Sequence, residues 1–294
     1  MSTEVDSMVP LKTVLCPIDF SDLSKKELAL ALEVCQTFGA ELVLLHNLAA
    51  ISPGLTRAWE WQQVHHSDKA TSAKAEEQMG QVLRELPKEV RVHASITAGP
   101  VATILLGLVV QLPADLVVLG SHGWSTEDHA SITERIIDRC PCPVLTIEEN
   151  MSWTQRFRLH GDGGKALPVV VPTDLASGGS SVTNYAFELA RNAGLEIHLL
   201  HVVPRDCSLL ELERAESGLS SIVPEDLVGR VQWHVRQGDP TYEILALSDI
   251  LQPGFLVMGE HARRFFRRLF TKDTAREVLH RAPCPVWFVP PGRR

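Results

Sequence analysis

Short apolar runs alternate with longer amphipathic stretches along the chain. Residues 13–18 form an apolar run that is typical of a buried strand. Residues 19–21 supply capping chemistry for a helix over 22–38, which Gly39 closes. The same patterns predict strands at 41–46, 90–96, 116–119 and 144–147, and helices at 68–86, 101–111 and 131–139. Strands that alternate with helices indicate a parallel sheet with helices on both faces.

The chain contains this unit twice. VLCPIDF at 14–20 matches VVVPTDL at 169–175, and the endings CPCPVLTI and APCPVWFV also match. The spacing is 155 residues for Asp19 and Asp174 and for His46 and His201, and 139 residues for Gly99 and Gly238 and for Gly120 and Gly259. We therefore expect two tandem Rossmann-like α/β domains, 1–150 and 151–294, with a linker at about 148–167. Each would hold a five-stranded parallel sheet flanked by helices.

Length, net charge and cysteine content limit the kinds of protein that this chain can be. The chain has 294 residues, enough for two domains, and a net charge of −8, which disfavours nucleic-acid binding. The first ten residues do not resemble a secretory signal, and the best apolar run, 102–110, is too short to span a bilayer. Six cysteines in this length do not indicate a disulfide framework. We expect a cytoplasmic protein.

Polar residues and glycines follow three predicted strands, at the edge where open parallel sheets bind ligands. The first strand ends in Pro17-Ile18-Asp19, the second in His46-Asn47 and the fourth in Gly120-Ser121-His122-Gly123. A helix start with Ser131 follows a few residues later. Glycines, free N–H groups and a helix start favour phosphate, and an acid suits a base amino group or a sugar hydroxyl. The pattern predicts a nucleotide site without a P-loop.

These motifs resemble the universal stress protein family in its tandem form. The resemblance implies a nucleotide-binding fold, frequent dimerisation and, in one subgroup, ATP binding through G-x2-G-x9-G-[ST]. It implies that the base lies against Asp19 and the backbone of Asn47, with ribose and phosphates near the fourth strand. The implied site residues in the first copy are Pro17, Asp19, Asn47, Gly120, His122, Gly123, Ala130 and Ser131. Asp174, Val202 and Gly259 are their counterparts in the second copy.

Both copies depart from that motif. In the first copy Ala130 replaces a glycine and the loop is three residues short. In the second copy Ala262 replaces a glycine and the acidic Asp273 stands at the helix start, where it competes with an anion. We therefore expect the ligand mainly in the first domain.

Several of these features also have simpler interpretations. Asp19 and Asp174 are equally compatible with capping of the following helices, and His46 and His201 with local hydrogen bonds. Cys140 and Cys142 fit packed thiols better than a zinc site. The arginine- and phenylalanine-rich segment 263–270 fits either an amphipathic turn or a surface for an anion, a membrane or a partner.

The sequence favours a stress-response protein that binds ligand and acts as a regulator, not as an enzyme. The expected cofactor is ATP or another adenine nucleotide, with or without Mg²⁺. One alternative is a nucleotide-free dimeric scaffold, and another is a weak ATPase assisted by His122 and His129. We expect a homodimer or an intrachain pseudo-dimer, without a nucleic-acid partner or a membrane span.

Overall fold

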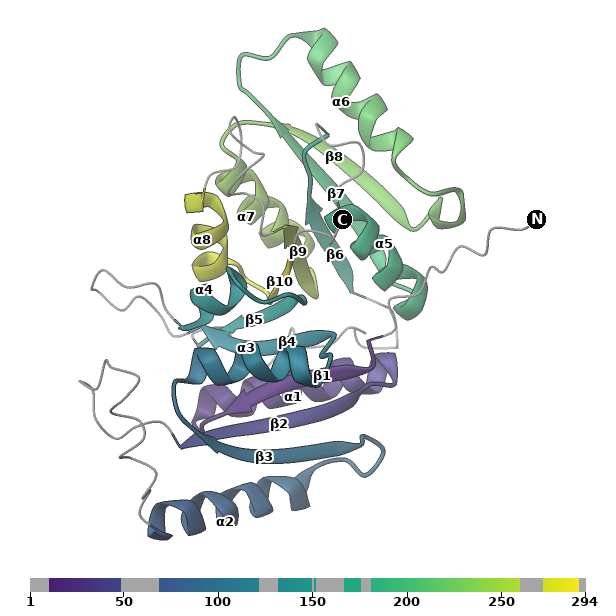
Figure 1. The fold of residues 1–294 in the computed structure, drawn as a ribbon. Helices are drawn as coiled ribbons and strands as arrows, with labels where there is room; N and C mark the ends of the chain where they lie inside the picture. Colours follow the sequence, from purple (N-terminus) through teal and green to yellow (C-terminus); the bar gives the residue numbers. More distant parts are fainter. Residues whose placement is uncertain are drawn as a thin grey trace. The chain divides into compact units, whose positions relative to one another are not determined.

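The chain divides into two compact units, each built on a sheet of strands (Figure 1). The computed structural model describes residues 11–48, 69–121, 132–149, 151, 167–175, 181–259 and 272–290. The first unit comprises residues 11–144, and the second begins at residue 145 and continues to the C-terminus. The strand β5 (Val144–Glu148) ends the first sequence repeat and lies almost wholly in the second unit.

The first unit contains a parallel sheet with the strand order β3-β2-β1-β4. Its strands are β1 (Thr13–Ile18), β2 (Glu41–Leu48), β3 (Val92–Ala98) and β4 (Leu116–Ser121). Ile18 pairs with His46, and Asn47 pairs with Thr97. Because of this register, the carboxyl ends of β1, β2 and β3 meet at one edge of the sheet.

Helices cover both faces of the sheet in the first unit. They are α1 (Asp22–Phe38), α2 (Lys69–Glu85), α3 (Val101–Gln111) and α4 (Ile132–Ile137). Leu15 of β1 packs with Leu105 and Val109 of α3 on one face. Cys16 points to the other face, where it lies near Cys35 of α1. Burial on both faces explains why β1 is an unbroken apolar run.

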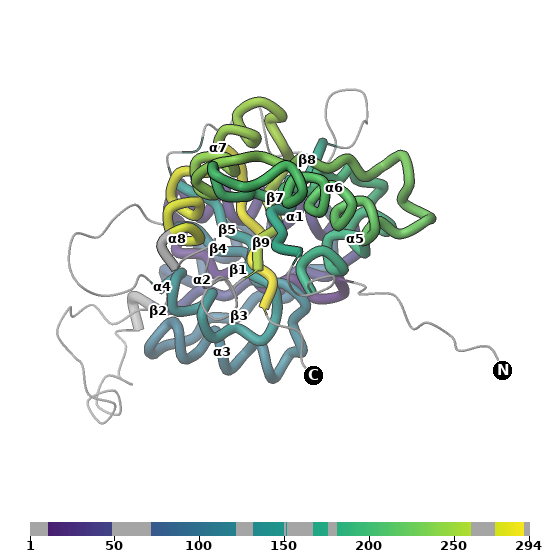
Figure 2. Tube along the Cα trace, turned by 90° about the horizontal axis from the view of Figure 1, so that it is seen from above, coloured from purple at the N-terminus to yellow at the C-terminus, as the bar shows by residue number. Residues whose placement is uncertain are grey.

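The second unit contains the strand order β5-β10-β9-β6-β7-β8. Its further strands are β6 (Pro168–Pro172), β7 (Glu196–Val203), β8 (Val231–Gln237), β9 (Phe255–Gly259) and β10 (Val286–Val289). Its helices are α5 (Ser181–Ala193), α6 (Leu209–Ser221), the 3-10 turn η2 (Glu225–Leu227), α7 (Pro240–Leu251) and α8 (Lys272–Arg281). Figures 1 and 2 show α7 and α8 side by side.

Most elements predicted from the sequence are confirmed. β1, α1 and α3 have the predicted bounds. The third strand was predicted two residues too early, because Val90 is buried like a strand residue although its N–H bonds to Pro87 O in a turn. The helix predicted to reach Arg139 ends at Ile137, because the Arg139 and Cys140 N–H groups both bond to Ile136 O.

Candidate functional site

Asp19 stands directly after β1 at the carboxyl edge of the first sheet. Its carboxylate is exposed, and Oδ1 accepts a hydrogen bond from the Ser21 N–H at 2.9 Å. The N-cap of α1 is Ser21, whose hydroxyl accepts from the Ser24 N–H at 3.2 Å. The capping interpretation is therefore wrong for Asp19. Its carboxylate faces solvent at the edge where parallel sheets bind ligands.

Phe20 and His46 tie the end of β1 to β2. Phe20 has a φ of +64°, a left-handed conformation that is uncommon outside glycine and asparagine. Its ring centroid lies 4.3 Å from that of His46. His46 Nδ1 is 2.8 Å from the Ile18 carbonyl oxygen, so the local hydrogen bond expected for this histidine is confirmed.

Two buried oxygen atoms at the ends of β2 and β3 have no hydrogen-bond partner among the described residues. Asn47 donates from Nδ2 to the Gly99 carbonyl oxygen at 3.1 Å, but its Oδ1 is unsatisfied. Thr97 Oγ1, on the residue that pairs with Asn47, is also unsatisfied. Each such atom costs about 1–3 kcal/mol, and native proteins contain few of them. The pair indicates a polar partner that the described residues do not supply.

Gly120, at the end of β4, packs closely against α1. A Cβ at this position would overlap Glu27 Oε1 and come within 2.6 Å of Leu23 Cδ2. The Gly120 N–H donates to the Glu27 carboxyl group, and its carbonyl oxygen accepts from Thr133 Oγ1 at 2.7 Å. The glycine is therefore required for the approach of α1. A contact between Gly120 and a ligand stays a prediction.

Glu27 is a buried acid that the sequence analysis missed. Glu27 is 6% exposed. Burial and the neighbouring Asp19 carboxylate raise its pKa to about 8, although the hydrogen bond from the Gly120 N–H acts in the opposite direction. At neutral pH the group is mostly protonated. A signal was present, because Glu27 lies on the same helical stripe as the apolar Leu23, Leu30 and Ala31.

The counterparts in the second unit are less polar. Val202 stands at the position of Asn47 and is fully buried, and Val182 stands at the position of Glu27. Asp174 is 8% exposed, whereas Asp19 is exposed. His201 Nδ1 lies 2.9 Å from the Thr173 carbonyl oxygen, which repeats the bond of His46. Gly259 ends β9 as predicted from the repeat.

Part of the predicted site lies outside the described residues. This holds for His122, Gly123, Ala130 and Ser131, and also for the segment 263–270. Pro17 lies in β1, where it pairs with Leu45 of β2. The described residues that the structure brings together at the edge are therefore Pro17, Asp19, Asn47 and Gly120.

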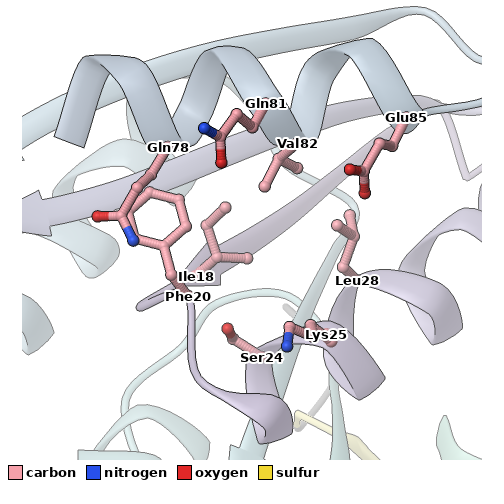
Figure 3. Close-up of a pocket in the computed structure, with 9 residues that line it drawn as sticks. All are labelled: Ile18, Phe20, Ser24, Lys25, Leu28, Gln78, Gln81, Val82 and Glu85. Carbon is pink, nitrogen blue, oxygen red and sulfur yellow. The ribbon is translucent and has the colours of Figure 1, made fainter. Parts of the chain in front are cut away.

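A pocket of about 230 Å³ lies between α1 and α2, beside this edge (Figure 3). Its floor is apolar, and its walls carry amide and charged groups. The lining residues are Ile18, Phe20, Ser24, Lys25, Leu28, Gln78, Gln81, Val82 and Glu85. None of the four edge residues is among the described residues that line it. Phe20 lines this pocket and also has the ring contact with His46 described above.

The cysteines are packed thiols, as expected. Cys140 and Cys142 are buried with their Sγ atoms 3.5 Å apart, and this contact, together with burial, raises the pKa of Cys142. In the described part of the chain, no group of three or more histidine, cysteine, aspartate or glutamate side chains has a metal-binding arrangement. The helices of that part are all too short or too polar to cross a bilayer.

The parallel sheets, the repeated strand ends and their histidine bonds define a tandem α/β protein with its polar groups at the carboxyl edge. The chain belongs to the universal stress protein family, whose model matches residues 10–148 and 167–290. The two matches confirm the tandem form inferred from the repeat.

Individual relatives agree with this family. A universal stress protein of Mycolicibacterium smegmatis is 23% identical over 302 aligned positions, covering 95% of this chain and 97% of the relative. A universal stress protein from Methanocaldococcus jannaschii is 25% identical over 143 residues, covering 47% of this chain and 82% of its own length. The crystal structure of a universal stress protein from Archaeoglobus fulgidus has the same fold, with a TM-score of 0.68 and 18% identity over 97% of this chain and 98% of the other.

Proposed function

We propose that the first unit binds an adenine nucleotide or a related nucleoside at the carboxyl edge of its sheet. The observation that carries this proposal is a pair of buried oxygens at neighbouring strand ends, Asn47 Oδ1 and Thr97 Oγ1, for which the described residues offer no partner. A nucleoside supplies amino groups, ring nitrogens and hydroxyls that can meet both atoms. The exposed carboxylate of Asp19 accepts from an amino group or a sugar hydroxyl.

The contrast between the two units supports a site in the first one. In the second unit a buried valine, Val202, replaces the asparagine amide. Arg236, at the position of Thr97, is already paired with Glu243 at 3.3 Å. The second edge therefore offers less unmet hydrogen-bonding capacity to a polar ligand.

We further propose that binding serves regulation and not turnover. The bonds given for two polar side chains at the edge, Asp19 Oδ1 with the Ser21 N–H and Asn47 Nδ2 with the Gly99 carbonyl oxygen, are to backbone groups, whereas nucleophilic catalysis uses a side-chain nucleophile beside a base. In such a regulator, the fraction of the protein that carries ligand reports the concentration of that ligand. The ligand-free scaffold is the alternative that the experiment below separates from it.

Denaturing extraction of freshly purified protein, followed by mass spectrometry of the released small molecules, tests the ligand class. Isothermal titration with adenosine at pH 7.5 then gives affinity and stoichiometry, and we expect one site per chain. Asp19→Asn should weaken binding about tenfold, the effect of losing a charge-assisted hydrogen bond. Asn47→Val, which copies the second unit, should also weaken it.

Asp22→Asn is the matched control, because Asp22 is exposed on α1 and pairs only with Lys25 among the described side chains. It should bind adenosine as the wild type does. If no adenine compound is released and none binds, the nucleotide proposal fails and the ligand-free scaffold replaces it. Equal weakening by all three substitutions would also argue against the edge as the site.

A further inference from the structure

Glu27 occupies the place where the fourth-strand glycine was expected to meet a phosphate. The Gly120 N–H, an anion donor by its position, already donates to the Glu27 carboxyl group. The Gly120 carbonyl oxygen is also paired, with Thr133. A phosphate bound near Gly120 therefore receives no hydrogen bond from the Gly120 N–H, and it lies close to the Glu27 carboxyl group.

Among the described residues, those around Glu27 give its negative charge little compensation. The carboxylate of Asp19 lies at the end of β1, and the Cys16 thiol lies further down that strand. The Asp19 carboxylate raises the energy of an ionised Glu27, whereas the Cys16 thiol, whose own pKa is raised, carries no charge there. On β4, the described group that bonds to Glu27 is the Gly120 N–H. On α1 itself, Lys25 Nζ forms an ion pair with Asp22 Oδ1 at 2.7 Å.

This acid distinguishes the two units. At the corresponding position the second unit has Val182, which is 8% exposed and cannot ionise. A valine at position 27 would pack on the apolar face of α1 equally well. The acid in the first unit therefore adds a charge-dependent property that packing does not require.

We propose that Glu27 selects ligands by charge at the first-unit edge, favouring an uncharged nucleoside or a monophosphate over a triphosphate. Neutral Glu27 tolerates a phosphate near Gly120, and ionised Glu27 repels it. Selectivity against phosphates therefore rises as the solution becomes more alkaline. Glu27 acts through the Gly120 amide and through its charge, so it is a positioning residue. The inference rests on the adenine site proposed above.

Isothermal titration with adenosine, AMP and ATP at pH 7.5 and pH 9.0 tests this inference. With the pKa of Glu27 at about 8, AMP affinity should fall by up to about eightfold over this interval if only the neutral form accepts the phosphate. Adenosine affinity should stay constant within about twofold. ATP should bind about fivefold or more weakly than AMP at pH 9.0, because it carries more charge.

Glu27→Gln should remove the pH dependence of AMP binding and leave adenosine binding unchanged. Glu77→Gln, an exposed acid of α2, is the matched control and should behave as the wild type. A second readout needs no variant. At pH 8, titration in buffers of different ionisation enthalpy should show about half a proton taken up per AMP and none per adenosine.

The two proposals fail in different ways. If adenosine does not bind, the adenine site is wrong and the role of Glu27 falls with it. If adenosine binds but ATP binds equally well at both pH values, or AMP takes up no proton, the site stands and the charge selection by Glu27 is wrong. An AMP pH dependence that persists in Glu27→Gln would also overturn it.

Discussion

Replacing Glu27 by glutamine keeps the shape of the side chain but removes its ionisable proton. The pKa of Glu27 is raised in the folded state, so the folded protein holds this proton more tightly than the unfolded chain does. The stability of the wild type is then greatest below the unfolded pKa and falls as the pH rises towards the folded pKa. Glu27→Gln does not undergo this loss.

The size of the effect follows from the two pKa values. The ordinary value is 4.5, and the folded value is about 8. At 1.36 kcal/mol for each pKa unit, the variant should gain on the order of 4–5 kcal/mol in unfolding free energy relative to the wild type. The gain should begin near pH 4.5 and be complete above pH 8. Against a typical stability of about 5–15 kcal/mol, this difference is large.

Urea unfolding followed by circular dichroism at pH 5, 6, 7, 8 and 9 measures the difference. Glu77→Gln on the exposed face of α2 is the control and should follow the wild type at every pH. A difference between Glu27→Gln and the wild type that is the same at pH 5 and pH 9 would refute the reasoning. So would a wild type that is the more stable protein at pH 9.

Three further predictions concern other parts of the chain. Gly120→Ala should cost about 1–3 kcal/mol of unfolding free energy in the same urea assay, because the added Cβ overlaps side chains of α1. Gly39→Ala should cost about 1 kcal/mol, because its φ of +69° is strained for alanine although no atom lies within 4 Å of the added Cβ. Cys207, the half-buried thiol among five buried ones, should react first with iodoacetamide, and mass spectrometry showing equal labelling of all six would contradict this. Burial lowers the pKa of His198 and of His234, whose Nδ1 and Nε2 atoms lie 2.9 Å apart. The free energy of unfolding should therefore fall as the pH drops below about 6.5, and it should fall less in His198→Gln. Identical pH profiles of the wild type and the variant would disprove this.

Much of the fold was predictable because burial on two faces leaves a clear sequence pattern. β1 and α3 are apolar runs with sharp ends, and the structure has them at the predicted residues. β3 was harder to place, since its residues are mostly exposed and the alternation of polar and apolar side chains did not mark an end. Edge strands of this kind carry less sequence information than central ones.

The candidate site was predictable only in part. Asp19 and Asn47 could be named because they follow strands that must end at one edge. The environment of Asn47, with Nδ2 bonded to Gly99 and Oδ1 without a partner among the described residues, depends on the register with β3, which no local pattern specifies. The position of Gly120 after the fourth strand predicts a close approach of ligand, but the structure gives this glycine a contact with α1 that only tertiary packing reveals.

The bond from each strand-end histidine to a carbonyl oxygen has an evolutionary consequence. His46 bonds to the backbone of Ile18 and His201 to that of Thr173, so the interaction is indifferent to the side chain of its acceptor. After duplication of an ancestral half, such a bond tolerates drift around it. Features that both halves share are therefore consistent with common descent, whereas the positions where the halves differ, such as Asn47 and Val202, are those at which our proposals predict different binding.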